Sequence, residues 1–462
     1  MNFKFLHNKK IMLLGLGRSN LALAKILNKN SIDFEIRDAS EQVINFNFNN
    51  SKVKFRFGSD YLKDLDFDII FRSPGVSYSC QELILARNRG AKISSEIELF
   101  FDICPCKICG ITGSDGKTTT TTLIYKILKK MGLNVFIGGN IGTPIISKIN
   151  KIKKHSIAIV ELSSFQLISM QKSPQISVIT NVSPNHLDVH KDLQDYFQAK
   201  FNIIKYQTSK DFIILNFEDK NLRSIAENAK SNVKFFSSKQ KANGAFIDQN
   251  GMIKIYYKNA EISMFNKNEI KIPGNHNVEN FLAAICSSMS ICKDCSEKFI
   301  NSVRYVARNF IGVEHRIEFV DEINGVKFYN DSIASSPTRT IKGALSVFKD
   351  NNIILIAGGY DKKLSFHELA VEICKKVKVL VLLGESASKI NEAVRKISKK
   401  IIIIYTKSMK EAIEISFSNA SEGDIILLSP ACASFGLYKN FEERGKDFKN
   451  IVKKIKIEYL GK

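Results

Sequence analysis

Long hydrophobic runs are absent from this sequence of 462 residues. The longest uninterrupted aliphatic runs, residues 379–383 and 401–404, are far shorter than the ~20 apolar residues that a membrane-spanning helix requires. The apolar stretch near the N-terminus covers only residues 11–16 and stops at Gly17 and Arg18, which argues against a secretory signal peptide. We therefore predict a cytoplasmic protein in which the short apolar runs are buried strands.

Cysteine contributes only nine residues, an odd number, and a cytoplasmic protein should hold them as thiols. Two close pairs, Cys104 with Cys106 and Cys292 with Cys295, resemble metal-ligand pairs. A structural zinc site needs four converging ligands, whereas Cys109 lies in an apolar run that predicts a strand with this side chain in a core. We therefore do not expect zinc.

Acidic residues are outnumbered, with 46 Asp and Glu against 68 Lys and Arg and a net charge of +22. Such an excess raises the possibility of nucleic-acid or membrane-surface binding. The lysines are spread along the whole chain, however, and no segment concentrates basic and aromatic residues together. A general bias toward Lys is the simpler explanation, and anionic small substrates fit it equally well; a nucleic-acid binder remains the least favoured alternative.

The remaining composition is that of an ordinary globular protein, with 44% apolar and 25% charged residues. The length predicts roughly three domains, each able to bury its own core. Strand and helix patterns alternate along the chain, which predicts an α/β protein whose three domains each contain a mostly parallel, doubly wound sheet. We place the domains at residues 1–97, 98–311 and 312–462.

The first domain begins as a nucleotide-binding fold does. Strand 11–14 is followed by the glycine-rich turn 15–20 and by a helix that includes residues 21–27, and further strands are expected at 34–37 and 67–71. Asn20 stands where a dinucleotide site has its third glycine, so the match to such a site is weak. An NAD-dependent dehydrogenase remains an alternative of a different class.

The middle domain contains a candidate phosphate-binding loop in residues 110–118, which read Gly-Ile-Thr-Gly-Ser-Asp-Gly-Lys-Thr. Glycines let backbone N–H groups surround an anion, Lys117 supplies a charge, and the Thr118 hydroxyl can bind Mg2+. The spacing departs from the strict motif because Gly110 is one residue too early. We predict an ATP-binding loop of variant form, with a ligand-free strand-to-helix turn as the alternative.

Polar residues follow two further strands of this domain. Strand 157–160 ends at Glu161, and strand 178–180 ends at Asn181, so both side chains are expected at the edge of the sheet where ligands bind. Glu161 can supply a carboxylate oxygen to Mg2+. Alternating short runs around Asn250 and Gly251 predict a small β insertion before a helix near residue 277.

The last domain repeats the strand and helix alternation. Strands are expected at residues 353–356, 379–383, 401–405 and 425–428, which predicts another parallel sheet.

Several motifs together resemble the Mur ligases, and they occur in the order found in that family. They are residues 113–118, 161–166, 181–188, 276–280, 314–316, 330–332 and 429–434. The resemblance covers nearly the full chain and is closest to the branch that adds D-glutamate. It implies an ATP-dependent ligase of peptidoglycan precursor synthesis, in which the L-alanyl carboxylate of UDP-N-acetylmuramoyl-L-alanine is phosphorylated to an acyl phosphate and then attacked by the amine of D-glutamate.

The resemblance also implies catalytic and metal-binding residues. Lys117 neutralises charge at the phosphates, Thr118 and Glu161 hold one Mg2+, and His186 holds a second. The family's carbamylated lysine, which supplies an anionic oxygen to the second metal, matches Lys200. Without the resemblance, the simpler interpretation of Lys200 is a solvent-exposed lysine on a helix.

Binding residues follow from the same motif matches. For ATP they are Gly113, Ser114, Asp115, Gly116, Lys117, Thr118, Thr119, Asn277, Asn280, Arg316 and Asp331. For the uridine nucleotide substrate they are Arg18, Ser19, Asp38, Ser73, Gly75 and Asn140. For glutamate they are Ser335, Lys362, Ser434 and Phe441. Local structural roles compete with some of these assignments: Asp38 could cap a turn, Asn277 could cap a helix, and Asp331 could merely begin a loop.

The sequence departs from the family at Ile333, where many members have a lysine near the incoming glutamate. Lys362 still offers a charge to one carboxylate, so a dicarboxylate substrate remains plausible. The stereochemistry stays open, because L- and D-glutamate carry identical charges. Related alternatives are an L-glutamate-adding Mur-type ligase and a folate polyglutamate synthetase, although the latter should lack the first domain. We expect a monomer.

Overall fold

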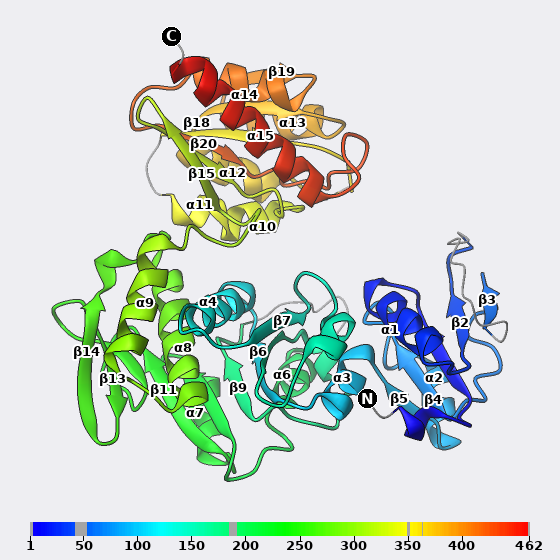
Figure 1. Ribbon diagram of the computed structural model, residues 1–462. Coiled ribbons are helices and arrows are strands. Elements are labelled where there is room, and N and C mark those ends of the chain that lie inside the picture. Colours follow the sequence, from blue (N-terminus) through cyan, green and yellow to red (C-terminus); the bar gives the residue numbers. More distant parts are fainter. Residues whose placement is uncertain (1–2, 42–52, 184–191, 349–351, 363, 461–462) are drawn as a thin grey trace. The chain divides into compact units, whose positions relative to one another are not determined.

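The structure is a computed structural model that describes residues 3–41, 53–183, 192–348, 352–362 and 364–460 (Figure 1). The chain forms two compact units: the first contains residues 1–271 and 275–309, and the second contains residues 272–274 and 310–462. Within the described parts, no helix is both long enough and apolar enough to cross a membrane.

The first sheet has five parallel strands in the order β3-β2-β1-β4-β5. The chain winds outward from β1 to β3 and then returns to β4 on the other side of β1. The switch point of the sheet therefore lies between β1 and β4, which is where open sheets of this kind bind ligands. The elements are η1 (Lys4–Leu6), β1 (Ile11–Leu14), α1 (Arg18–Lys29), β2 (Glu35–Asp38), β3 (Lys54–Phe57), β4 (Ile69–Arg72), α2 (Gln81–Asn88), β5 (Lys92–Ser94) and α3 (Glu96–Ile103).

The first turn of this sheet has Asn20 in place of a third glycine, and the hydrogen bonds of Asn20 account for this substitution. Its side chain is fully buried, and Nδ2 donates to the carbonyl oxygens of Leu14, Gly15 and Phe71 at 2.8 to 3.1 Å. The amide therefore ties α1 to the ends of both β1 and β4. Any residue with a larger or apolar side chain would leave these carbonyls without this donor.

The central sheet has nine strands in the order β14-β13-β12-β11-β10-β9-β6-β8-β7. The seven strands from β12 to β7 are parallel, while β13 and β14 are antiparallel additions at one edge. The strands are β6 (Lys107–Thr112), β7 (Val135–Gly139), β8 (Ile157–Glu161), β9 (Ile176–Ile179), β10 (Phe212–Asn216), β11 (Asn232–Ser237), β12 (Ala245–Ile247), β13 (Met252–Tyr257) and β14 (Ala260–Asn266).

The predicted hairpin at Asn250 and Gly251 is confirmed, since these residues join β12 to β13 and Gly251 has φ of 78°. The helix that follows begins at Asn275, two residues before the expected position. The helical elements of this region are α4 (Lys117–Lys130), η2 (Ile145–Lys151), α5 (Ser164–Leu167), α6 (Leu193–Phe201), α7 (Lys220–Glu227), η3 (Lys267–Glu269), α8 (Asn275–Cys292) and α9 (Glu297–Asn309).

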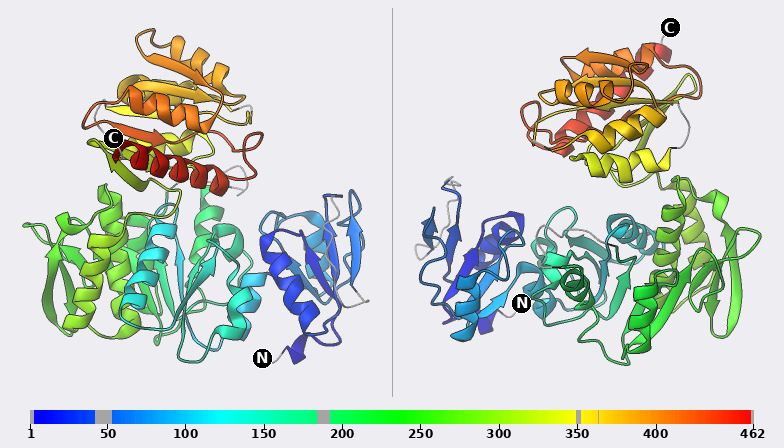
Figure 2. Two further views of the ribbon diagram at one scale, coloured as in Figure 1. Left: turned by 45° about the horizontal axis from the view of Figure 1, so that its top comes forward. Right: turned by 180° about the vertical axis from the view of Figure 1, so that it is seen from behind.

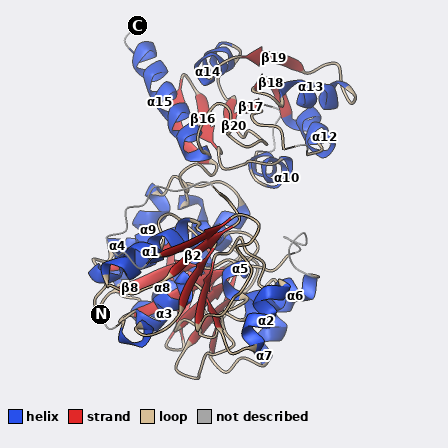
Figure 3. Cartoon of the chain, turned by 90° about the vertical axis from the view of Figure 1, so that its right-hand side faces the viewer, coloured by secondary structure: helices blue, strands red, loops and turns tan. Residues whose placement is uncertain are grey.

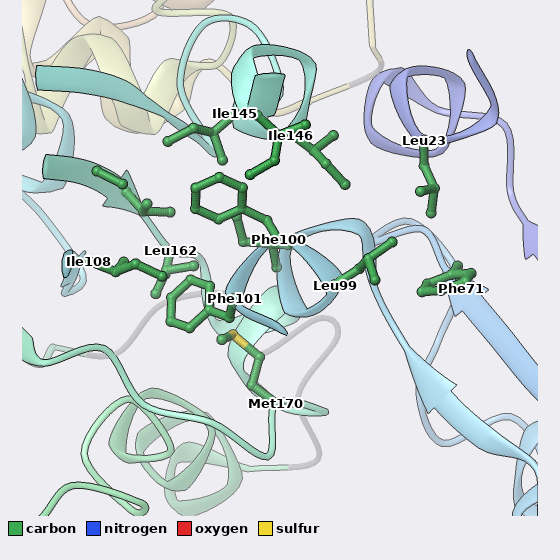
Figure 4. Packing of buried hydrophobic residues seen from close by; sticks show 14 of the residues in the cluster. Leu23, Phe71, Leu99, Phe100, Phe101, Ile108, Ile145, Ile146, Leu162 and Met170 are labelled. Carbon is green, nitrogen blue, oxygen red and sulfur yellow. The ribbon is translucent and has the colours of Figure 1, made fainter. Parts of the chain in front are cut away.

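Helix α3 connects the first sheet to the central sheet within one continuous core (Figure 4). Figure 4 shows Leu99 on the side of Phe71, while Phe100 lies beside Ile145 and Phe101 beside Leu162. Burying a side chain of this size contributes about 2 kcal/mol relative to leaving it exposed. The short helix α3 therefore packs against both sheets, which explains why its sequence is largely apolar.

The second unit contains a six-stranded sheet in the order β15-β16-β20-β17-β18-β19, in which only β15 is antiparallel. Alternate residues of its central strands enter two separate cores, one with α11, α12 and α13 and the other with α14 and α15. Helices cover both faces of this sheet (Figures 2 and 3). The elements are β15 (Glu318–Ile323), β16 (Val326–Asn330), α10 (Pro337–Lys342), α11 (Ala344–Val347), β17 (Ile353–Ala357), α12 (His367–Lys376), β18 (Val377–Leu383), α13 (Ala387–Arg395), β19 (Ile402–Thr406), α14 (Met409–Ser418), β20 (Ile425–Leu428) and α15 (Phe441–Leu460).

Burial on both faces explains why the strands of this sheet read as unbroken apolar runs, as parallel sheets do. The predicted α/β class with mostly parallel sheets is confirmed in all three parts of the chain.

Candidate active site

The loop between β6 and α4 has a backbone that requires glycine. Gly113 has φ of 147° and Gly116 has φ of 79°, both in the region that L side chains rarely adopt. A Cβ atom on Gly113 would lie 1.9 Å from Thr180 Oγ1, and one on Gly116 would lie 2.2 Å from Asn280 Oδ1. The glycines thus let the loop backbone turn tightly at the N-terminus of α4.

The end of β9 fixes this loop from the neighbouring strand. The backbone N–H of Ser114 donates to Asn181 O, and that of Asp115 donates to Asn181 Oδ1, each at 3.0 Å. Thr180 Oγ1 donates to Asp115 O at 2.6 Å. The loop is therefore held in one conformation by residues that follow an adjacent parallel strand.

Two lysine side chains converge on one carbonyl oxygen of the loop. Lys117 Nζ donates to Gly113 O and to Ser114 O at 2.8 Å, and Lys200 Nζ donates to Gly113 O at 2.9 Å. Burial, together with the charge of Lys117, lowers the pKa of Lys200 to about 7. Lys200 is thus 2% exposed and is not the solvated helix lysine that its local sequence predicts.

Glu161 ends β8 with its carboxylate buried, and the residue is 2% exposed. Asn140 Nδ2 donates to Oε1 at 2.9 Å, and the Asn140 backbone N–H donates to the Glu161 carbonyl at 2.9 Å. Within the described part of the chain, Oε2 has no hydrogen-bond partner. A buried carboxylate oxygen without a donor beside the phosphate loop has the chemistry of a ligand for a hard cation.

The side chain of Arg72 links the first sheet to the segment that follows β8 of the central sheet. Arg72 ends β4 and is 2% exposed, and its guanidinium donates to Phe165 O at 2.6 Å and to Val76 O at 2.5 Å. Phe165 belongs to α5, which follows Glu161 and begins with a capping box between Ser163 and Gln166. Burial lowers the pKa of Arg72 to about 10.

Asn280 connects α8 to the phosphate-loop helix. The residue is 5% exposed, Thr120 Oγ1 donates to its Oδ1 at 3.2 Å, and its Nδ2 donates to Asn277 Oδ1 at 3.2 Å. Asn277 is the third residue of α8 and not the residue before it. The helix-cap alternative for Asn277 therefore has no support.

In the second unit, Asp331 is buried directly after β16. Ser429 Oγ donates to its Oδ2 at 2.7 Å, and the backbone N–H of Ile317 donates to its Oδ1 at 3.3 Å. Burial raises the pKa of Asp331 to about 7, and these hydrogen bonds and the charge of Arg316 oppose the rise. A residue that merely began a loop would not be held in this way.

Arg444 of α15 contributes a second buried cation to this unit. It is 3% exposed, its Nε donates to Ser332 Oγ at 3.0 Å, and its Nη2 donates to Ser332 O at 2.8 Å and to Cys432 O at 3.1 Å. Its Nη1 has no hydrogen-bond partner among the described residues. Burial lowers the pKa of Arg444 to about 10.

Comparison with protein families identifies all three parts of the chain. Residues 9–95 match the Mur ligase MurD-like N-terminal domain, residues 111–288 match the Mur ligase middle domain, and residues 315–432 match the Mur ligase, glutamate ligase domain. The chain belongs to the Mur ligase family. It is therefore an ATP-dependent enzyme that forms amide bonds.

Curated relatives of this Mur ligase match it along almost the whole chain. It is 46% identical over 463 residues to the UDP-N-acetylmuramoylalanine–D-glutamate ligase of Acetivibrio thermocellus, and 46% identical over 461 residues to that of Clostridium tetani. Each comparison covers 98% of both chains.

Solved structures of the family share the fold at lower identity. UDP-N-acetylmuramate-alanine ligase MurC from Thermotoga maritima has a TM-score of 0.57 at 19% identity, covering 97% of this chain and 100% of the other. MurF ligase from the same organism, in complex with ADP, has a TM-score of 0.55 at 16% identity, covering 98% and 97%. These likenesses support the three-domain α/β fold.

The structure brings most of the predicted ATP and metal residues of this Mur ligase together. Gly113 to Thr119 form the loop and the first turn of α4, and Glu161, Lys200, Asn277 and Asn280 lie on the elements that contact them. Arg316 and Asp331 belong to the second unit. His186 lies outside the described residues.

The residues predicted for the uridine nucleotide gather at the switch point of the first sheet, except Asn140. Asp38 Oδ2 accepts the Leu16 N–H at 2.6 Å in the glycine-rich turn, and the side chain of Ser73 packs against Gly15. Arg18 and Ser19 begin α1, and Gly75 is exposed in the loop after β4. Asn140 instead holds the Glu161 carboxylate.

The predicted glutamate residues of this Mur ligase occupy loops of the second unit. Ser434 is buried after β20, and Phe441 begins α15, where its carbonyl accepts Ser332 Oγ at 2.8 Å. Ser335 is half-buried, and Lys362 is exposed after β17. Arg444, which sequence reasoning missed, is separated from Ser332 by 112 positions, so no local pattern indicates their contact.

Proposed function

We propose that this Mur ligase adds D-glutamate to UDP-N-acetylmuramoyl-L-alanine in peptidoglycan precursor synthesis. The observation that carries the proposal is the 46% identity over 98% of both chains to ligases with that name. The nine cysteines are free thiols, which suits the reducing cytoplasm where we expect the enzyme to act as a monomer.

The phosphate loop is where we place the ATP phosphates. Its glycines allow the tight turn that places the loop at the N-terminus of α4, where a helix favours an anion, and Lys117 lies against the loop carbonyls. ATP supplies the phosphoryl group that converts the acceptor carboxylate to an acyl phosphate, from which phosphate leaves more readily than hydroxide. The part of Lys117 is to neutralise negative charge as carboxylate and phosphates approach.

Two Mg2+ ions fit the donor groups that this site offers. The unpartnered Oε2 of Glu161 and the hydroxyl of Thr118 would hold the first ion, and Asn140 fixes the Glu161 carboxylate through its other oxygen, Oε1. Lys200 suits the second ion once carbamylated, because its pKa of about 7 leaves a neutral amine available to CO2 near neutral pH. His186 completes our assignment for that ion.

The acceptor nucleotide is proposed to bind at the switch point of the first sheet. Arg18, Ser19, Asp38, Ser73 and Gly75 all lie at the carboxyl ends of β1, β2 and β4 or on the N-terminus of α1. The N-terminus of α1 favours an anionic diphosphate, because its first N–H groups are not used within the helix.

Glutamate is proposed to bind in the second unit at Ser335, Lys362, Ser434 and Phe441. Ile333 removes the cation that the family often places here, but the guanidinium of Arg444 keeps a positive charge beside Ser332. Lys362 and Arg444 together would balance both carboxylates of glutamate. The charge balance does not distinguish D- from L-glutamate, which makes the L-glutamate-adding ligase the rival.

Phosphate release tests the proposed reaction. The enzyme is incubated with ATP, Mg2+ and UDP-N-acetylmuramoyl-L-alanine, with D-glutamate and L-glutamate added in parallel. Release that requires both the nucleotide acceptor and D-glutamate is the expected result. Release with L-glutamate alone would move the chain to the rival ligase, and release that depends on neither amino acid nor acceptor would overturn the ligase reaction.

A further inference from the structure

Residues 104–106 form a Cys-Pro-Cys segment that the ligase reaction does not use. It connects α3 to β6, the strand that leads into the phosphate loop. Cys104 follows the last turn of α3, where its backbone N–H donates to Phe100 O at 2.9 Å, and Cys106 directly precedes Lys107 of β6. The part of the chain that the structure describes contains no cluster of three potential metal ligands, so a metal does not account for the pair.

The two thiols contact each other. Their Sγ atoms are 3.5 Å apart, which is within hydrogen-bond distance for sulfur. Cys106 Sγ also lies 3.4 Å from Lys107 O, and Cys104 Sγ lies 3.8 Å from Cys106 O. All nine cysteines are described, and each of them is a free thiol.

The environment gives the two thiols different reactivity. Cys106 is 8% exposed and packs in the core of the first unit, whereas Cys104 is partly exposed at its rim. A hydrogen bond from Cys106 lowers the pKa of Cys104, while the same contact and burial raise the pKa of Cys106. An accessible thiol with a lowered pKa beside a shielded partner is the arrangement of an attacking and a resolving cysteine.

We propose that Cys104 and Cys106 are a redox modification site, which low-molecular-weight disulfides oxidise reversibly to an intramolecular disulfide. The Cys104 thiolate attacks one sulfur of the small disulfide, forming a mixed disulfide and releasing one small thiolate. Cys106 then loses its proton and attacks Cys104 Sγ, which forms the intramolecular bond and releases the second small thiol. Two protein thiols are oxidised and one small disulfide is reduced to two thiols.

The bond needs only a local movement, since the sulfurs must approach from 3.5 Å to about 2.05 Å. It closes a ring over a single intervening residue, Pro105, so it restrains the unfolded chain little. Short, strained disulfides are easily reduced. The modification is therefore expected to be labile and to leave the fold intact.

Thiol trapping of the full-length enzyme tests this site. The protein is incubated with oxidised glutathione, remaining thiols are alkylated, and peptides are analysed by mass spectrometry. We expect the peptide containing residues 104–106 to lose two hydrogen atoms and to escape alkylation, and dithiothreitol to restore it. Cys292 and Cys295 serve as an internal comparison, because burial raises the pKa of both thiols.

Two variants separate the steps. In Cys106→Ser the reaction should stop at a glutathione adduct on Cys104, and in Cys104→Ser modification of Cys106 should be slower, by on the order of tenfold. The site would be refuted if the unaltered protein accumulated only the mixed disulfide, or if Cys104 reacted no faster than Cys292 and Cys295. The inference goes beyond the proposed function, and because ligase turnover is not its readout, either can fail without the other.

Discussion

At the scale of single residues, the phosphate loop is a place where positive charge is concentrated before any ligand binds. Lys117 and Lys200 both donate to the Gly113 carbonyl, and their mutual repulsion, added to burial, explains the lowered pKa of Lys200. An anion bound at the loop would relieve that repulsion. Relief of the repulsion between the two lysines therefore favours phosphate binding, and neither lysine alone would provide this contribution.

Removing the Lys117 side chain should stop catalysis without unfolding the protein. In Lys117→Ala we expect turnover to fall by about 100-fold or more, because the lost group is a charge at the reacting phosphates and not core volume. Phosphate release measures the effect, and thermal unfolding checks the fold. Lys129→Ala, on the exposed last turn of the same helix, is the matched control. Normal turnover of Lys117→Ala would refute the assignment of the loop.

Lys200→Ala should lose most of its activity and recover part of it with small carboxylates. Formate or acetate can place an anionic oxygen where the carbamylated side chain would have placed one. In the unaltered enzyme, activity should decline as the pH falls below about 7, since protonated Lys200 does not react with CO2. Full activity of the variant without added carboxylate would leave Lys200 with a structural role only.

Asp331 should make stability depend on pH. Its pKa is raised from 3.8 to about 7, so between these values the folded protein binds a proton that the unfolded chain has released. The free energy of unfolding should therefore fall as the pH rises from about 4 to 7, by up to about 1.4 kcal/mol per pH unit. Urea unfolding across this range should show a flatter profile for Asp331→Asn. The same slope in the variant would contradict the buried carboxyl as its source.

At the scale of elements, the strand ends explain why the site is built where it is. β6, β8 and β9 are neighbours in a parallel sheet, and each carries polar residues proposed for the site at its last residue or immediately after it. The sequence predicted these strands, the phosphate loop and the hairpin at Gly251, because glycine positions and apolar runs are local signals. It did not predict the hydrogen bonds that connect segments far apart in the sequence.

The hydrogen bond from Arg72 to Phe165 is the clearest example of such an unpredicted contact. The serine that follows Arg72 belongs to the proposed nucleotide site, and the arginine guanidinium reaches Phe165, 93 positions away, in the helix after Glu161. No local pattern near residue 72 distinguishes a buried arginine from an exposed one. Arg444 is similar, since its partners Ser332 and Cys432 are set by the packing of α15.

Arg72→Ala should destabilise the first unit. The substitution leaves the Phe165 and Val76 carbonyls without this donor and empties buried space, so we expect a loss of about 2–4 kcal/mol in the free energy of unfolding. Urea denaturation measures it. Arg89→Ala, an exposed arginine directly after α2, should change stability by less than about 0.5 kcal/mol. Equal effects of the two substitutions would show that the buried contacts contribute nothing.

At the scale of the whole molecule, the chain combines three parallel sheets, and polar residues proposed for substrate binding follow strands in each of them. Except for Asn140, the residues that we propose for the nucleotide lie in the first sheet, the described residues proposed for phosphate and metal lie mainly in the second, and those proposed for glutamate lie in the third. The order of the motifs along the sequence predicts this division. Family models match the chain in each of its three parts.

The sequence alone does not determine the amino-acid substrate, because Ile333 stands where many members of the family have a lysine. Arg444 restores a cation near the same segment, so a dicarboxylate amino acid still fits the charges of the second unit. Charge is nevertheless the same in both enantiomers of glutamate. The choice between them therefore needs a direct measurement of the product.

A competition between isotopically labelled D-glutamate and unlabelled L-glutamate provides that measurement. Both are supplied at equal concentration with ATP, Mg2+ and UDP-N-acetylmuramoyl-L-alanine, and the nucleotide product is weighed by mass spectrometry. We predict a product that carries the labelled glutamate almost exclusively. A product carrying unlabelled L-glutamate, or no product heavier than the acceptor, would contradict D-glutamate ligation by this chain.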